Sequence, residues 1–160
     1  MKKELTIPIE LYADSGELEP DDAELLNLAR KSTGDAYAPY SRFRVAAAVR
    51  LANGKTLSGT NQENASYPAG ICAERVVLSA ASAVYPGVAV TALAVSYFRE
   101  DGTLSKPVSP CGICRQSLSE YELRAGRPIR IILSGHSGEV LILRAAGDLL
   151  PLAFTSAELK

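Results

Sequence analysis

The three cysteines of the chain lie in two short segments, and this grouping limits the folds that the chain can adopt. The first segment, residues 61–75, reads NQENASYPAGICAER and contains Cys72. The second, residues 109–116, begins about forty residues after Cys72, reads SPCGICRQ and contains Cys111 and Cys114. We interpret the two segments as halves of one site and the rest of the chain as its scaffold.

The size and charge of the chain favour one ordinary domain and a small neutral ligand. A chain of 160 residues can bury roughly 68–70% of its unfolded surface in a single core. Apolar residues make up 47% of the sequence and charged residues 22%, which is usual for globular proteins. The formal net charge of -1 gives no basic surface for polymeric nucleic acid. We expect one domain over residues 1–160, with residues 1–12 as an N-terminal arm.

The N-terminus and the cysteine count both predict a cytoplasmic protein. Residues 1–17 contain no apolar core of signal-peptide length, and no run of about eighteen apolar residues occurs anywhere, so we expect no membrane association. Three cysteines cannot all form pairs. In a reducing compartment a CxxC sequence is more often metal-binding or catalytic than a structural disulfide.

Hydrophobic patterns predict helices that alternate with strands. Pro8 indicates an edge position for the first strand, Asn53-Gly54 indicates a hairpin, and Pro20 marks a helix start. Strands are expected near residues 3–11, 43–51, 55–60, 88–98, 128–134 and 139–144, and helices near 20–33, 72–84, from about 111, and 145–150. This order favours a three-layer α/β/α sandwich, with a mixed five-stranded sheet and helices on both faces.

The cysteines are suited to hold a catalytic zinc ion. Catalytic zinc sites use three protein ligands and leave one position for water. Cys111 and Cys114 are three residues apart and share a helix face, and each cysteine falls near a helix start, where the dipole lowers a thiol pKa. The lone His136 lies in a predicted turn far from these segments, so it is not an obvious fourth ligand.

Glu74 and Arg75 follow the first cysteine closely enough to act at the same ion. In a regular helix Cys72 and Glu74 would point apart, so both can face the metal only if Cys72 lies at the non-helical edge of the first turn. We interpret Glu74 as the group that carries protons beside the metal. Arg75 is interpreted as a hydrogen-bond donor to the thiolates, which offsets their negative charge.

A glutamate two residues after a metal ligand, followed by P-C-x-x-C, is the pattern of the zinc deaminases. The chain resembles the small homo-oligomeric cytidine deaminases over essentially residues 20–155. The matching pieces are AYAPYSRFRVAAAV, NQENASYPAGICAER, SPCGICRQSL and LLPLAF. The resemblance implies Zn²⁺ held by Cys72, Cys111 and Cys114, with Glu74 as general acid and base.

The resemblance also implies substrate contacts. Asn61 and Glu63 would hold the ribose hydroxyls, Phe43 would contact the pyrimidine ring, and Ala73 would also touch the nucleoside. Phe154 in the tail would reach the site of a neighbouring subunit, in a homotetramer with shared active sites. The expected reaction is the hydrolytic deamination of cytidine and 2′-deoxycytidine in pyrimidine salvage.

Several alternatives stay open at this point. The zinc could be structural, or the CxxC could be a buried redox pair. Phe43 could be ordinary core, Phe154 could anchor the tail in its own core, and Asn61 and Glu63 could merely cap a loop. The enzyme could be a blasticidin-S-type deaminase of nucleoside antibiotics, or a polynucleotide editor, and the protein could instead be a non-catalytic zinc- and nucleoside-binding oligomer. Ala46 replaces a glycine usual in the family, and we expect it to narrow the space beside the base.

Overall fold

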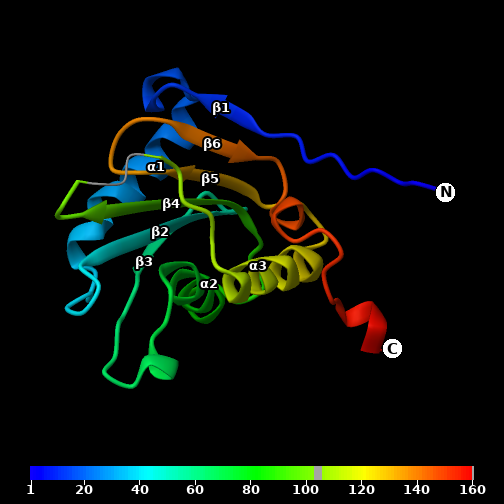
Figure 1. Cartoon of the computed structure of the whole chain (residues 1–160). Coiled ribbons are helices and arrows are strands. Elements are labelled where there is room, and N and C mark those ends of the chain that lie inside the picture. Colours follow the sequence, from blue (N-terminus) through cyan, green and yellow to red (C-terminus); the bar gives the residue numbers. More distant parts are fainter. Residues whose placement is uncertain (103–105, 160) are drawn as a thin grey trace.

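A mixed sheet forms the centre of the computed structural model, which describes residues 1–102 and 106–159 (Figure 1). The strand order is β1-β6-β5-β4-β2-β3. The strands are β1 (Glu10–Tyr12), β2 (Phe43–Leu51), β3 (Thr56–Thr60), β4 (Val90–Arg99), β5 (Arg130–Ser134) and β6 (Val140–Leu143). Strands β4 and β5 run parallel and the other neighbouring pairs run antiparallel. The sheet is mixed, as predicted.

The helices cover both faces of the sheet, which confirms the three-layer prediction. Helix α1 (Pro20–Ser32) packs on one face, and α2 (Ala73–Val84) and α3 (Gly112–Ala125) pack on the other (Figure 1). Proline suits the first turn of α1, and the acidic Asp21 and Asp22 beside it favour the positive end of the helix dipole.

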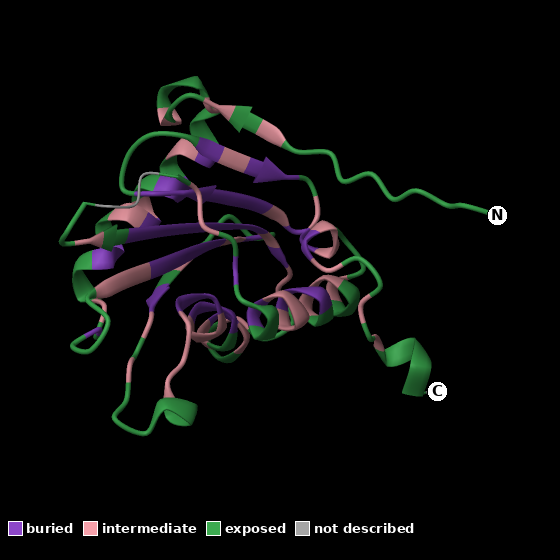
Figure 2. Cartoon of the chain, in the orientation of Figure 1, coloured by how far each residue is buried: buried purple, intermediate pink, exposed green. Residues whose placement is uncertain are grey.

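Each face of the sheet has its own buried core. On the α1 side, the helix residues Leu25, Leu26 and Ala29 pack with sheet residues that include Ala48 and Ile132. On the other side, a larger cluster joins apolar residues of α2 and α3 to the sheet: Val49, Val77, Leu78, Leu93, Leu118 and Leu133. Figure 2 shows the buried residues along the central strands and on the helix faces turned toward them. The central strands are therefore buried on both faces.

The predicted number of strands was wrong, because part of the N-terminal segment joins the sheet. Glu10, Leu11 and Tyr12 pair with β6 at the sheet edge and make a sixth strand. Residues 1–9, which include most of the strand or extended arm expected over residues 3–11, extend away from the body and are exposed (Figures 1 and 2). The partner strand β6 offers only a short edge, and Pro8 lacks the N–H that a longer ladder would need.

The hairpin after β2 turns at the predicted Asn53-Gly54, but its loop has three residues. Gly54 N–H donates to the carbonyl of Leu51, and Leu51 N–H donates to the carbonyl of Lys55. Only Gly54 of the pair has a positive φ, +80°, as in a type I turn followed by a left-handed glycine. The expected helix 145–150 is a 3-10 helix, Ala146–Leu149. Among the described parts of the chain, no helix combines the length and the apolar composition needed to cross a bilayer.

Candidate active site

The sheet brings the starts of α2 and α3 together, and a cysteine caps each helix. Cys72 precedes α2 with extended backbone angles (φ -74°, ψ 151°), and Cys111 precedes α3 in the same way (φ -67°, ψ 167°). Cys114 is buried in the first turn of α3. The non-helical backbone at Cys72 is the condition that lets Cys72 and Glu74 face one space, as the sequence required.

The three sulfur atoms form one cluster. Cys72 Sγ lies 3.8 Å from Cys111 Sγ, and Cys111 Sγ lies 3.5 Å from Cys114 Sγ. All three atoms are within 4.8 Å of one another. These separations are too long for a disulfide, in which the sulfurs are about 2.05 Å apart. Tetrahedral zinc with Zn–S bonds of about 2.3 Å holds its sulfur ligands about 3.8 Å apart. The cluster therefore fits Zn²⁺, as predicted.

The cluster also favours one thiolate at neutral pH. Interaction with the nearby Cys114 thiol lowers the pKa of Cys72 to about 5, against the effect of burial. Cys111 and the charge of Arg75 lower it further. The same interaction with Cys72, together with burial, raises the pKa of Cys114. Metal binding displaces the remaining protons, since zinc takes cysteine as thiolate.

Arg75 lies next to this cluster from the first turn of α2. Its positive charge contributes to the low pKa of Cys72. Its Nε is buried and has no hydrogen-bond partner within residues 1–102 and 106–159. A buried donor of this kind costs free energy unless a negative group faces it. The surroundings of Arg75 therefore suit a donor to metal-bound thiolates.

Glu74 is buried at the same place, with 4% of its surface exposed. Burial raises the pKa of its carboxyl, and the charge on Cys72 raises the pKa further. A carboxyl with a raised pKa binds a proton more readily near neutral pH, which is the property that a general acid needs. The side chain also faces the cavity that adjoins the cysteines.

A cavity of about 330 Å³ opens beside the cluster. Seven of its lining residues were singled out from the sequence: Phe43, Asn61, Glu63, Cys72, Ala73, Glu74 and Cys111. Cys114 and Arg75 do not line it. Two of the three expected metal ligands, Cys72 and Cys111, and Glu74 thus share a wall with the residues assigned to the nucleoside.

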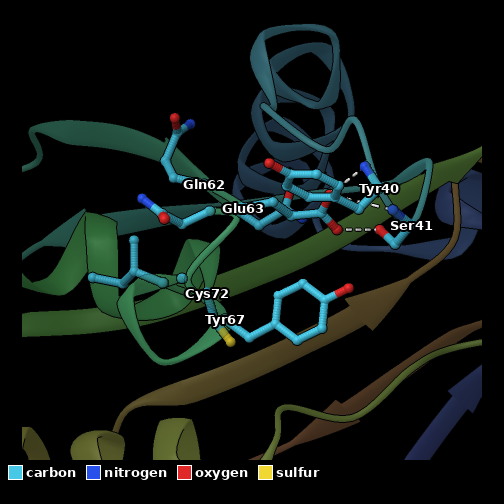
Figure 3. A pocket seen from close by; sticks show the side chains of 10 residues that line it. Tyr40, Ser41, Gln62, Glu63, Tyr67 and Cys72 are labelled. Carbon is cyan, nitrogen blue, oxygen red and sulfur yellow. Dashed lines mark hydrogen bonds between the residues drawn. The ribbon is translucent and has the colours of Figure 1, made fainter.

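Glu63 is held in place by the preceding loop. Its carboxylate accepts hydrogen bonds from the backbone N–H of Tyr40 at 2.8 Å, from that of Ser41 at 3.2 Å, and from the Ser41 hydroxyl. Figure 3 shows these bonds at the rim of a second hollow of about 390 Å³, which Tyr40 and Tyr67 also line. Desolvation opposes the charge on Glu63, but the bonds from Ser41 and Tyr40 outweigh it and keep the carboxyl pKa below its usual value.

Asn61 binds the backbone of β2. Its Oδ1 accepts from Val45 N–H at 2.8 Å, and its Nδ2 donates to the Phe43 carbonyl at 2.9 Å. An amide oxygen accepts two hydrogen bonds and an amide nitrogen donates two, so one of each is left over. Asn61 therefore has a structural role, and its amide also keeps one unused hydrogen-bond donor and one unused acceptor at the cavity.

One expectation, the effect of Ala46 on the space beside the base, differs from the structure. Ala46 is fully buried and does not line either hollow, because it alternates with the cavity-facing Val45 and lies on the other face of the sheet. It therefore does not narrow the space beside the base. Phe154 is 59% exposed and lies outside the cavity of its own chain. Its carbonyl accepts a hydrogen bond from Gln116 at 2.9 Å.

Six further residues of the cavity wall were not predicted from the sequence: Ser41, Val45, Val95, Tyr97, Val108 and Ser109. Val45 and Tyr97 are opposite each other in the β2–β4 register, and Val95 lies two residues before Tyr97. The period of two along a strand places all three side chains on the face of Phe43. This periodicity was available in the sequence, but the pairing of β2 with β4 was not.

The fold and the site together define a zinc-dependent deaminase. The chain belongs to the cytidine and deoxycytidylate deaminase family, whose zinc-binding region matches residues 19–126. A cytidine deaminase of Halalkalibacterium halodurans is 33% identical over 139 residues, which cover 87% of this chain and 98% of that protein.

Two further comparisons bear on fold and substrate. The crystal structure of cytidine deaminase from Burkholderia pseudomallei is 37% identical, with a TM-score of 0.72 over 86% of this chain and 100% of that one. The blasticidin-S deaminase of Bacillus cereus is 28% identical over 138 residues, or 84% of this chain and 92% of that protein.

Proposed function

We propose that the protein catalyses the hydrolytic deamination of cytidine and 2′-deoxycytidine to uridine and 2′-deoxyuridine, with release of ammonia. The proposal rests on one observation: a buried glutamate with a raised carboxyl pKa shares a cavity wall with two thiols of a three-thiol cluster that fits zinc. A purely structural zinc site would not need this carboxyl, and it would not need an open cavity beside the metal.

Cys72, Cys111 and Cys114 would hold the zinc, and Arg75 would donate hydrogen bonds to the thiolates. When bound, zinc lowers the pKa of water and so supplies a nucleophile at neutral pH. Glu74 carries the protons of the reaction. Its carboxylate takes a proton from the attacking water and gives it to N3 of the base. It then takes the second proton of that water from the hydroxyl now bonded to the ring carbon and gives it to the departing amine. One water is consumed and one ammonia leaves.

The other end of the cavity would bind the sugar. Glu63 is an acceptor fixed by Tyr40 and Ser41 before any ligand arrives, which reduces the entropy cost of binding. Asn61 offers one free donor and one free acceptor to a second hydroxyl. Phe43 and Ala73 would contact the base, since both line the same cavity as Glu63 and Cys72.

We further propose that the chain acts as one deaminase domain, with residues 1–12 as an arm, in a homotetramer with shared active sites. The exposure of Phe154 supports this assembly, because a large aromatic side chain at the surface is available to a neighbouring subunit. Three free thiols suit a reducing cytoplasm and a role in pyrimidine salvage. Light scattering tests the assembly, and a monomeric, fully active enzyme would refute the shared site.

Ammonia release from a panel of compounds tests the reaction. Purified zinc-loaded protein is incubated with cytidine, 2′-deoxycytidine, cytosine, CMP and blasticidin S. We expect turnover of the two nucleosides. Turnover of blasticidin S alone would favour the antibiotic deaminase, and nucleoside binding without ammonia release would favour a non-catalytic binding protein. Either result would overturn the proposal.

A further inference from the structure

Tyr97 is the largest residue of the cavity wall that the proposed chemistry does not use. It lies on β4, directly opposite Val45, and only 2% of its surface is exposed. A tyrosine so deeply buried needs a partner for its hydroxyl. Tyr97 finds that partner in the Lys106 carbonyl, to which its hydroxyl donates at 2.7 Å. Burial raises the pKa of Tyr97, which keeps the phenol protonated as a donor.

The ring of Tyr97 supports the aromatic wall of the cavity. Its centroid lies 5.1 Å from that of Phe43, and the two ring planes are tilted by 31°. Phe43 itself begins β2, is only half-buried and lines the cavity. The Tyr97 ring is held by its backbone in β4 and by its hydroxyl on the Lys106 carbonyl. Contact with this ring restricts the orientations open to the Phe43 side chain.

The hydroxyl of Tyr97 acts on a second part of the same wall. Its acceptor, Lys106, lies just ahead of Val108 and Ser109, which line the cavity, and of Cys111 at the start of α3. This hydrogen bond ties the segment after residue 105 to the central strand β4. One side chain therefore contacts both the β2 side and the α3 side of the cavity.

We propose that Tyr97 is a positioning residue for the nucleoside, which sets the cavity width by holding Phe43 on one side and the Lys106–Ser109 segment on the other. This inference rests on the proposed function. It concerns substrate affinity and assigns Tyr97 no part in proton transfer, because Tyr97 acts on the substrate through its neighbours.

Gly135 gives the proposal a second test from outside the cavity. A Cβ at this position would lie 3.2 Å from the Tyr97 hydroxyl oxygen, 3.3 Å from the Ser137 carbonyl oxygen and 3.4 Å from Cζ of the Tyr97 ring. Gly135 does not line the cavity. The Gly135→Ala variant would therefore crowd the Tyr97 phenol without replacing any lining residue.

The experiment compares Tyr97→Phe with Tyr121→Phe. Tyr121 is a matched control, since its hydroxyl donates to the Leu78 carbonyl at 3.0 Å and accepts from Ser82 at 3.0 Å, away from the cavity. The readouts are the Kd for the product uridine by calorimetry, and KM and kcat for cytidine. For Tyr97→Phe we expect Kd and KM to rise about five-fold, as for the loss of one hydrogen bond, with kcat nearly unchanged.

Gly135→Ala should reproduce the rise in Kd, while Gly34→Ala, whose added Cβ would meet no heavy atom within 4 Å, should not. Wild-type affinity for uridine in both Tyr97→Phe and Gly135→Ala would overturn the proposal. An equal loss in Tyr121→Phe would also overturn it, because the effect would then be general to buried hydroxyls. Failure of the wild type to release ammonia from cytidine would instead refute the proposed function, so the two failures are distinguishable.

Discussion

The guanidinium of Arg115 donates a hydrogen bond from Nε to the carbonyl oxygen of Pro110, 2.8 Å away, directly ahead of Cys111. A second bond runs from its Nη1 to the Leu149 carbonyl at 3.1 Å. Arg115 thus fixes the backbone that presents one metal ligand, and it anchors that backbone to the C-terminal region.

Replacing Arg115 with methionine should weaken zinc retention. Methionine has a similar length but no donor, so the Pro110 and Leu149 carbonyls lose a partner and the Cys111 backbone is free to shift. Groups that orient metal ligands typically change affinity by about 10–100-fold. The rate of zinc transfer to a chromogenic chelator should rise within this range. Arg127→Met, at an exposed position after α3, is the control, and equal rates in both variants would contradict the assignment.

Glu74→Gln should separate zinc binding from turnover. The amide keeps the shape of the side chain but cannot carry a proton, so kcat should fall by about 10²–10⁴-fold, the usual contribution of a general acid or base. Zinc content, measured by atomic absorption, should stay at the wild-type level. Cys111→Ala should lose both zinc and activity. Glu120→Gln, exposed on α3, should change neither, and a fully active Glu74→Gln enzyme would exclude the proton-transfer role.

Asn61→Ala should destabilise the protein as well as weaken nucleoside binding. The substitution leaves the Val45 N–H and the Phe43 carbonyl without their amide partner. We expect a loss of about 1–3 kcal/mol in the free energy of unfolding, measured by urea denaturation. Asn27→Ala, at an exposed position of α1, should have little effect. If the two variants are equally stable, the amide of Asn61 has no structural role.

The ionisation of Glu63 predicts a defined pH dependence. Its folded-state pKa lies below the ordinary value of 4.5, so its carboxylate stabilises the folded protein above that pH. The contribution is lost only as pH falls through the folded-state pKa. The difference in unfolding free energy between wild type and Glu63→Gln should therefore be constant from pH 8 to about 5 and shrink below that range. A difference that already shrinks between pH 7 and 6 would contradict the lowered pKa.

Gly59→Ala tests how closely β3 approaches α2. A Cβ at Gly59 would lie 2.8 Å from the backbone nitrogen of Val77 and 3.1 Å from the Val77 Cβ. Helix α2 must then move, and it carries Ala73 and Glu74. We expect a loss of about 1–3 kcal/mol in unfolding free energy, typical of overpacking, together with reduced turnover. Gly34→Ala is again the matched control, and equal melting temperatures would show that the contact can relax.

Sequence patterns predicted correctly those features that depend only on neighbouring residues in the chain. Pro20 with its two acidic neighbours gave the start of α1 correctly, and the spacing of Cys72 and Glu74 required the non-helical cap that the structure has. Features that depend on strand pairing could not be predicted. The sixth strand needs β6 beside Glu10, and the place of Tyr97 in the cavity needs Val45 opposite it. The same limit applies to the Asn61 amide, whose backbone partners lie 16 and 18 residues away.

The caps at Cys72 and Cys111 have a consequence for folding. A zinc ion bound by both cysteines would act as a cross-link that closes a loop containing all of α2 and β4. This loop forms only after α2 and α3 have docked on the sheet. The complete ligand set is therefore a property of the native state and not of the unfolded chain. By mass action, free zinc should raise the melting temperature in proportion to the logarithm of its concentration, so the supply of this ion would govern the lifetime of the protein as well as its activity.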